Sequence, residues 1–152
     1  LESGSAYFIP EPSYGHFSEA AGIDKPVQAM RRAGQDLFRK AILTAYRGRC
    51  AVTGIDDPRL LNASHIVSWS SSTGDRMNLR NGLCLSALHD RAFDRHLITF
   101  DTDWRLLVRK DVPEAARSGL LRGAATHLQM PERFLPDPEL MRLHRERFRE
   151  AA

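Results

Sequence analysis

The stretch NASHIVSWSSSTGDRMNLRNGLCLSALHDRAFDRHLITFD, residues 62–101, carries the strongest structural signal of the chain. It begins inside a short run, LLNASHIV at 60–67, which predicts a strand with His65 near its end. The Ser-, Gly- and Asp-rich segment that follows predicts an irregular loop, closed by an Asn-Gly pair. From Ser86, a possible helix N-cap, apolar residues at helical spacing predict a helix with a His-Asp pair near its start.

The flanking segments predict an α+β fold. Residues 28–49, QAMRRAGQDLFRKAILTAYRGR, have an apolar stripe that predicts a long helix with a stop at Gly48. The run CAVTGI at 50–55 predicts a short strand, and we expect it to form a hairpin with 60–67. After the second helix, LITFDTDWRLLVRK predicts another hairpin around an Asp-Thr-Asp turn, and PELMRLHRERFREAA predicts a basic terminal helix.

The amino-terminal segment, residues 1–28, has Pro and Gly residues without sustained periodicity. It is expected to be a linker or an arm left from cloning, and the folded domain is expected at 29–152. The opening LESGS and the missing initiator Met suggest one module of a longer protein.

Composition places the chain among ordinary soluble globular domains, with 42% apolar and 27% charged residues in 152. Lys and Arg number 22 against 19 Asp and Glu, a mild basic bias that suits a polyanionic partner without requiring one. No apolar run reaches membrane-spanning length and the start lacks a secretory signal, so a cytoplasmic location is expected. The two cysteines are too few for an all-Cys zinc site and are expected to be buried free thiols.

Two carboxylates, Asp90 and Asp94, are four residues apart and are therefore expected on one face of the second helix. Neighbouring arginines, Arg91 and Arg95, could relieve their repulsion in an ordinary surface helix. The alternative is a divalent cation such as Mg²⁺, which prefers oxygen ligands. His65, the polar loop and the Asn-Gly pair in the same segment favour a functional site.

Together, RCAVTGI, LLNASHIV and NLRNGLCLSALHDRAFDRHLITF resemble an HNH nuclease domain, in the branch that lacks zinc-binding Cys pairs. The resemblance spans about residues 35–100, and GQDLFRKAILTAYRGRCAVTG resembles the sequence before this core in bacterial restriction nucleases. It implies a ββα-metal core at about residues 50–100, with an N-terminal helix, a following β-hairpin and a C-terminal helix.

The resemblance also implies roles for single residues. His65 matches the general base that takes a proton from the attacking water. Asn81 matches the middle motif residue, whose side chain ties the loop to the histidine strand. Asp90 and Asp94 match the two ligand positions of the helix, and His89 becomes the ligand if the helix is shifted by one residue.

The implied cofactor is one divalent ion, Mg²⁺ or Mn²⁺ rather than Zn²⁺, because both helix ligands are carboxylates. Ser64 stands where many relatives have an Asp or His ligand. Whether the protein supplies a third metal ligand is therefore left open. No structural zinc is expected, since Thr53 and Ala87 replace the second Cys of each pair in zinc-bearing relatives. The expected phosphate contacts are six arginines, Arg47, Arg49, Arg76, Arg80, Arg91 and Arg95.

The resulting hypothesis is a metal-dependent DNA endonuclease, the cleavage module of a bacterial, possibly modification-dependent, restriction or defence enzyme. A recognition domain in the same full-length chain and a homodimer are both compatible with it. Two alternatives remain: a non-catalytic nucleic-acid-binding module on the same scaffold, and a structural α+β domain whose Asp90 and Asp94 only bond neighbouring arginines.

Overall fold

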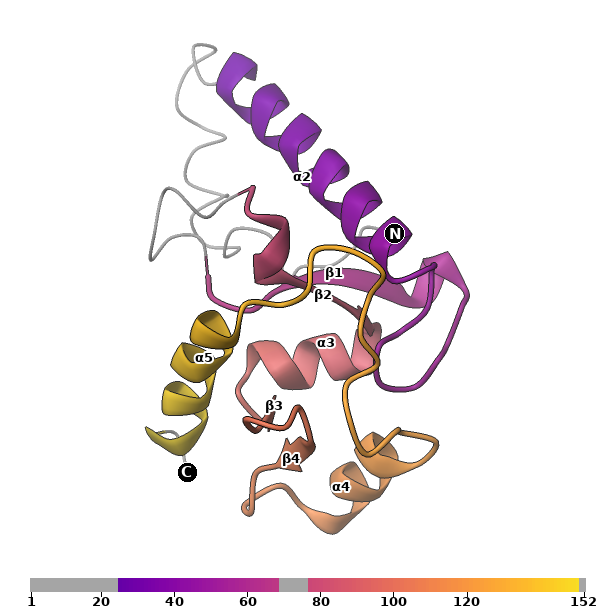
Figure 1. The fold of residues 1–152 in the computed structure, drawn as a ribbon, viewed down its shortest axis with the longest axis vertical. Helices are drawn as coiled ribbons and strands as arrows, with labels where there is room; N and C mark the ends of the chain where they lie inside the picture. Colours follow the sequence, from indigo (N-terminus) through magenta and orange to yellow (C-terminus); the bar gives the residue numbers. More distant parts are fainter. Residues whose placement is uncertain (1–24, 69–76, 151–152) are drawn as a thin grey trace.

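The computed structural model describes residues 25–68 and 77–150, and Figure 1 shows their arrangement. The helices and strands of these residues are, in chain order, α2 (Lys25–Ala45), a 3₁₀ turn (Pro58–Leu60), β1 (Leu61–His65), a second 3₁₀ turn (Leu79–Asn81), β2 (Gly82–Ser86), α3 (Ala87–Asp94), β3 (Ile98–Phe100), β4 (Leu106–Val108), α4 (Glu114–Leu121) and α5 (Pro138–Glu150). The predicted α+β class is confirmed, with the order β1, β2, α3 at its centre. None of the described helices has the length and apolar character needed to cross a membrane.

The antiparallel hairpin β1–β2 lies between two helices, α2 on one face and α3 on the other (Figure 1). Side chains alternate along each strand, so Asn62 and Ser64 point toward α3 while His65 points toward α2. In the register of the hairpin, His65 is opposite Gly82. The two faces of β1 therefore contact two different helices.

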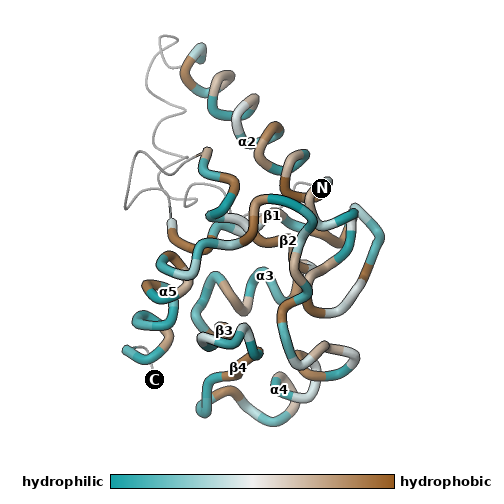
Figure 2. The backbone as a smooth tube through the Cα atoms, in the orientation of Figure 1, coloured by the Kyte–Doolittle hydropathy of each residue, from teal (hydrophilic) through white to brown (hydrophobic). Residues whose placement is uncertain are grey.

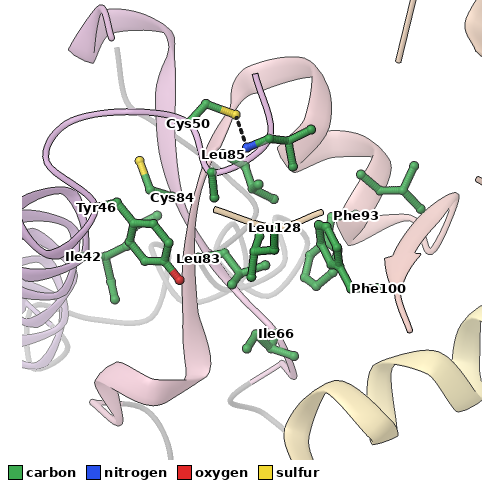
Figure 3. Packing of buried hydrophobic residues seen from close by; sticks show 14 of the residues in the cluster. Ile42, Tyr46, Cys50, Ile66, Leu83, Cys84, Leu85, Phe93, Phe100 and Leu128 are labelled. Carbon is green, nitrogen blue, oxygen red and sulfur yellow. Dashed lines mark hydrogen bonds between the residues drawn. The ribbon is translucent and has the colours of Figure 1, made fainter. Parts of the chain in front are cut away.

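The core fills both sides of this hairpin (Figure 3). On one side, Phe38 and Ile42 of α2 are buried at helical spacing. On the other, Leu83 and Leu85 of β2 pack toward Phe93 of α3. Figure 2 shows the matching alternation of apolar and polar positions along α2 and α5. Helices α2 and α5 are amphipathic, and each buries one apolar stripe against the rest of the fold.

Several local predictions are confirmed. The Ser86 side chain accepts from the backbone N–H of His89 and caps α3 as expected. Asp101 accepts from the backbone N–H groups of Asp103 and Arg105, which closes the turn between β3 and β4. The terminal helix begins at Pro138 and packs against β3.

Other expectations are wrong. The run CAVTGI forms a turn instead of a strand, because β1 pairs with β2 across the long loop. In that turn the Cys50 Sγ atom accepts from the backbone N–H groups of Val52 and Thr53, and Figure 3 draws one of these two bonds. After the loop, Asn81 ends the second 3₁₀ turn, and Gly82 is extended and begins β2. Helix α4 was not predicted, and α2 begins three residues before Gln28.

Gly82 is needed where it is because α2 lies directly over it. A Cβ atom there would be 2.6 Å from Ile42 Cδ1 and 2.8 Å from Phe38 Cζ, both in the core. We expect Gly82→Ala to lower the free energy of unfolding by about 1–3 kcal/mol through overpacking. Urea denaturation would measure this, and Ile42→Val in the same background should recover part of the loss. Wild-type stability in Gly82→Ala would contradict this packing.

A buried histidine joins α5 to the rest of the fold. His144 stacks on Phe93, with ring centroids 3.8 Å apart. Its Nε2 atom donates to the carbonyl of Phe93 at 2.9 Å, and Nδ1 then accepts from the Thr99 hydroxyl at 2.8 Å. Burial, with a smaller contribution from the nearby charges of His96, Arg145 and Arg147, lowers the pKa of His144 to about 3.

This shift predicts acid sensitivity. Between pH 6.5 and pH 3 the unfolded chain binds a proton at this imidazole and the folded chain does not, so stability falls as pH falls. At pH 4.5 the loss from this one group is about 2–3 kcal/mol. We expect His144→Gln to show a flatter dependence of unfolding free energy on pH between 4.5 and 7 than the wild type. Parallel curves for the two proteins would refute the assignment.

Candidate active site

His65 is the last residue of β1, at the point where the chain leaves the hairpin. Its imidazole is partly exposed and stacks on the ring of Phe38, with centroids 4.2 Å apart and planes at 10°. The side chain thus has one face on the protein core, at the last residue of β1.

Asn81 holds the chain just beyond His65. Its Oδ1 atom accepts from the backbone N–H of Val67 at 2.9 Å, and its Nδ2 atom donates to the carbonyl of Val67 at 3.0 Å. The backbone N–H of Ile66 donates to the Asn81 carbonyl as well. Because Asn81 is fully buried, these bonds are shielded from water and fix the end of β1.

Asp90 is a buried acidic residue, with 2% of its surface exposed. Asn62 Nδ2 donates to one carboxylate oxygen at 2.6 Å, and the Ser64 hydroxyl donates to the other. Burial raises the pKa of Asp90 to about 6, the charge of Asp94 adds to the increase, and the two hydrogen bonds oppose it. The carboxylate is therefore buried with neutral hydrogen-bond donors on both oxygens.

Asp94 lies one helical turn after Asp90, and its side chain is exposed. Partial desolvation raises the pKa of Asp94, while the charges of Arg91, Arg95 and His96 lower it. The two predicted ligand residues thus share a side of α3 and feel each other's charge, as their spacing implied.

His89 points elsewhere. Its Nδ1 atom is 3.0 Å from the Ser86 hydroxyl, and its Nε2 atom is 2.8 Å from the carbonyl of Leu120 in α4. Burial lowers the pKa of His89. Both ring nitrogens are used inside the fold, so Asp90, and not His89, faces the strand that carries His65.

The acidic pair suits Mg²⁺ or Mn²⁺ better than Zn²⁺. In residues 25–68 and 77–150, no three His, Cys, Asp or Glu side chains cluster closely enough to hold a metal. Asp90 and Asp94 can supply oxygen ligands only, which is the preference of Mg²⁺ and Mn²⁺ when water completes the coordination. A cation would also offset the cost of burying the Asp90 charge among neutral donors.

The predicted arginines that the structure describes differ in their contacts. Arg91 and Arg95 are exposed beside Asp94, as expected. Arg47 instead pairs with Glu132 at 2.5 Å, and Arg80 Nε donates to the carbonyl of Leu135 at 2.9 Å. Arg49 is exposed on the turn after α2, and Arg76 lies outside the described residues.

Two residues near the site were not predicted, Asn62 and Arg39. Asn62 is two positions before Ser64, so strand alternation alone places both on the face of Asp90. Arg39 of α2 donates to the carbonyls of Leu61 at 2.7 Å and Pro58 at 2.9 Å, which anchors the start of β1. The period of two in NASH was a usable signal for Asn62, whereas nothing local indicated Arg39.

Ser64, which bonds to Asp90, and His65, the predicted base, are consecutive, so their Cα atoms are about 3.8 Å apart. Ser64 binds Asp90 on the α3 side, and His65 lies on the α2 side. An ion held by Asp90 would therefore lie on the α3 side of this strand end, and the His65 imidazole lies on the α2 side.

Comparison with protein families gives a match for residues 50–101, less than half of the chain, to a family model described as HNH endonuclease. The matched segment contains β1, β2, α3 and β3, including His65, Asn81, Asp90 and Asp94. A search of curated proteins found no match.

Proposed function

With residues 50–101 forming an HNH endonuclease domain, we propose that the protein is a metal-dependent DNA endonuclease in which His65 is the general base. One observation carries the proposal: His65 and the Ser64–Asp90 pair are adjacent at the end of one strand but face opposite sides of it. The family itself implies a nuclease acting on DNA.

In the proposed reaction, a phosphodiester lies across the end of β1. His65 in its neutral form accepts a proton from water, and the water oxygen forms a bond to phosphorus as the bond from phosphorus to the 3′ oxygen breaks. The products are a 5′-phosphate and a 3′-hydroxyl, the latter protonated from solvent. Asn81 keeps the imidazole in place by holding Val67, directly beyond the strand end.

HNH nucleases generally use a divalent metal, and Asp90 and Asp94 are the residues proposed to hold it here. When bound, Mg²⁺ or Mn²⁺ would stabilise the charge that develops on the phosphate and the leaving oxygen. Asn62 and Ser64 each donate to one Asp90 oxygen and so orient the carboxylate before any ion arrives. His89 is not proposed as a ligand, because both of its nitrogens are already bonded.

Phosphate contacts are proposed for Arg91 and Arg95, which flank Asp94 on the exposed side of α3. Arg47 and Arg80 can take part only if their bonds to Glu132 and Leu135 are given up. The biological setting we propose is the cleavage module of a bacterial restriction or defence enzyme in the cytoplasm, with a recognition domain in the full-length chain and a possible dimer. This part rests on the resemblance of the segment leading into the matched region.

Plasmid nicking tests the proposal. Supercoiled DNA is incubated with the chain and Mg²⁺ or Mn²⁺, with parallel reactions in EDTA and in Ca²⁺. Conversion to the nicked form that needs Mg²⁺ or Mn²⁺ and is abolished by EDTA is the expected result. Absence of any product across these ions would contradict the proposed activity.

A second candidate is a nucleic-acid-binding module without catalysis. Ser64 favours it, because a hydroxyl replaces the Asp or His ligand of many relatives and already bonds to Asp90. In the described part of the chain, no third His, Cys, Asp or Glu side chain joins the pair in a group that could hold a metal. DNA binding without nicking under all of the ions above would support this candidate.

A further inference from the structure

Helix α2 lies outside the segment that matches the family, yet it contacts the proposed general base. The contact is made by Phe38, whose ring lies parallel to the His65 imidazole at 4.2 Å between centroids. Phe38 is 1% exposed and is packed in the same core cluster as Ile42. Its ring is therefore a fixed surface against which the imidazole rests.

The opposite strand leaves room for this contact. Gly82 is the register partner of His65, and any Cβ at this position would come within 2.9 Å of Ile42 and Phe38 atoms. Only glycine lets α2 approach closely enough for the Phe38 ring to reach the imidazole. The stacking thus depends on a close approach that the backbone of β2 provides.

The next residue of α2 fixes the same helix to the start of β1. Arg39 donates to the carbonyls of Leu61 and Pro58, at the end of the strand remote from His65. Consecutive residues of α2 thus hold both ends of β1. The position of the Phe38 ring relative to His65 is therefore fixed by α2, which is not part of the hairpin.

We propose that Phe38 is a positioning residue that orients the His65 imidazole for proton transfer. The inference rests on the proposed function and adds to it a component outside the matched segment. The χ2 torsion of histidine is broad and roughly two-fold, so the side-chain rotamer alone does not fix the ring plane. A buried ring parallel to the imidazole within 10° restricts that torsion and keeps the reacting nitrogen aimed at the strand end.

The test compares Phe38→Leu with Ile42→Val in the whole chain. Both substitutions remove core volume beside Gly82, but only the first removes the ring that faces His65. We expect Phe38→Leu to lower kcat for nicking on the order of 10- to 100-fold, with KM for DNA and Mn²⁺ affinity unchanged. Ile42→Val should keep the wild-type kcat after correction for the folded fraction.

A second readout does not depend on activity. In NMR spectra of the metal-free protein, the ring protons of His65 should show an upfield ring-current shift that disappears in Phe38→Leu and persists in Ile42→Val. Equal kcat in the two variants, in a wild type whose nicking needs His65, would overturn the positioning role while leaving the proposed function intact. Wild-type protein without His65-dependent nicking would contradict the proposed function and the role of Phe38 with it.

Discussion

Replacing His65 with alanine should reduce the rate of plasmid nicking by about 10²- to 10⁴-fold, the usual contribution of a general base. The physical reason is that the His65 imidazole is the proposed acceptor of the proton of the attacking water. DNA affinity, measured with Ca²⁺ or without divalent ions, should stay near the wild-type value, because the proposed phosphate contacts come from Arg91 and Arg95, which are exposed beside Asp94. Nicking rates under single-turnover conditions would measure the effect.

His127→Ala is the matched control. His127 lies on the segment between α4 and α5, where it forms a β-bridge with Arg105, and it is not in the matched family segment. This variant should cut DNA at the wild-type rate. If His65→Ala retained wild-type nicking, or if both variants lost activity equally, the proton-transfer role of His65 would be wrong.

Asp90→Asn should produce two opposite effects, a lower affinity for Mn²⁺ and a higher stability of the metal-free protein. The carboxylate is buried with only neutral donors, and its pKa of about 6 lies above the ordinary value of 3.8. The folded chain binds a proton here that the unfolded chain has lost, so this group lowers stability as pH rises through 3.8 to 6. Removing the charge should therefore raise the free energy of unfolding at pH 7.5 by about 1–3 kcal/mol.

Metal binding should weaken at the same time, by about 10- to 100-fold, because an amide is a poorer ligand than a carboxylate. Denaturation with and without Mn²⁺ measures both effects in one experiment. Asp94→Asn is the matched control, one turn along the same helix with an exposed side chain. It should weaken Mn²⁺ binding without the gain in metal-free stability, and a wild-type thermal shift with Mn²⁺ in Asp90→Asn would exclude Asp90 as a ligand.

Elements with local signals were predictable. The Ser86 cap, the Asp101 turn and the periodic residues of α5 are all determined within a few residues of sequence, and the structure has them where expected. The turn at Cys50 is not a strand although its β-branched residues, Val52, Thr53 and Ile55, predict one, whereas β1 forms a strand without any β-branched residue. What decides between them is the pairing of β1 with β2, across a loop that no local pattern describes.

Helix α4 was missed, although Pro113 at its start and Gly123 beyond its end are usable signals. Gly123 has a φ of 69°, the left-handed conformation common after a helix end. The eight residues of α4 are too few to show a clear apolar period, and Leu120 is the one buried residue among them. The carbonyl of this residue also bonds to His89, which is why the alternative ligand is turned inward.

Some residues of the candidate site could likewise be predicted from sequence, and others could not. His65, Asn81 and the pair on α3 were recognisable because their order and spacing are a sequence pattern, and the matched family segment contains all of them. Phe38 was visible only as a helix residue beside an apolar stripe, since its stacking on His65 requires α2 and β1 to be packed together. Contacts of this kind depend on tertiary structure, so no spacing in the chain reports them.

The proposed mechanism requires an ion held by Asp90 of α3, next to the end of β1 that carries His65. Anomalous scattering from crystals soaked in Mn²⁺ would locate that ion directly. We predict a peak at roughly 2.2 Å from a carboxylate oxygen of Asp90, on the side of α3 that carries Asp94 and next to the strand end. Saturating Mn²⁺ with no peak at Asp90, or a peak bound by other residues away from His65, would contradict the account.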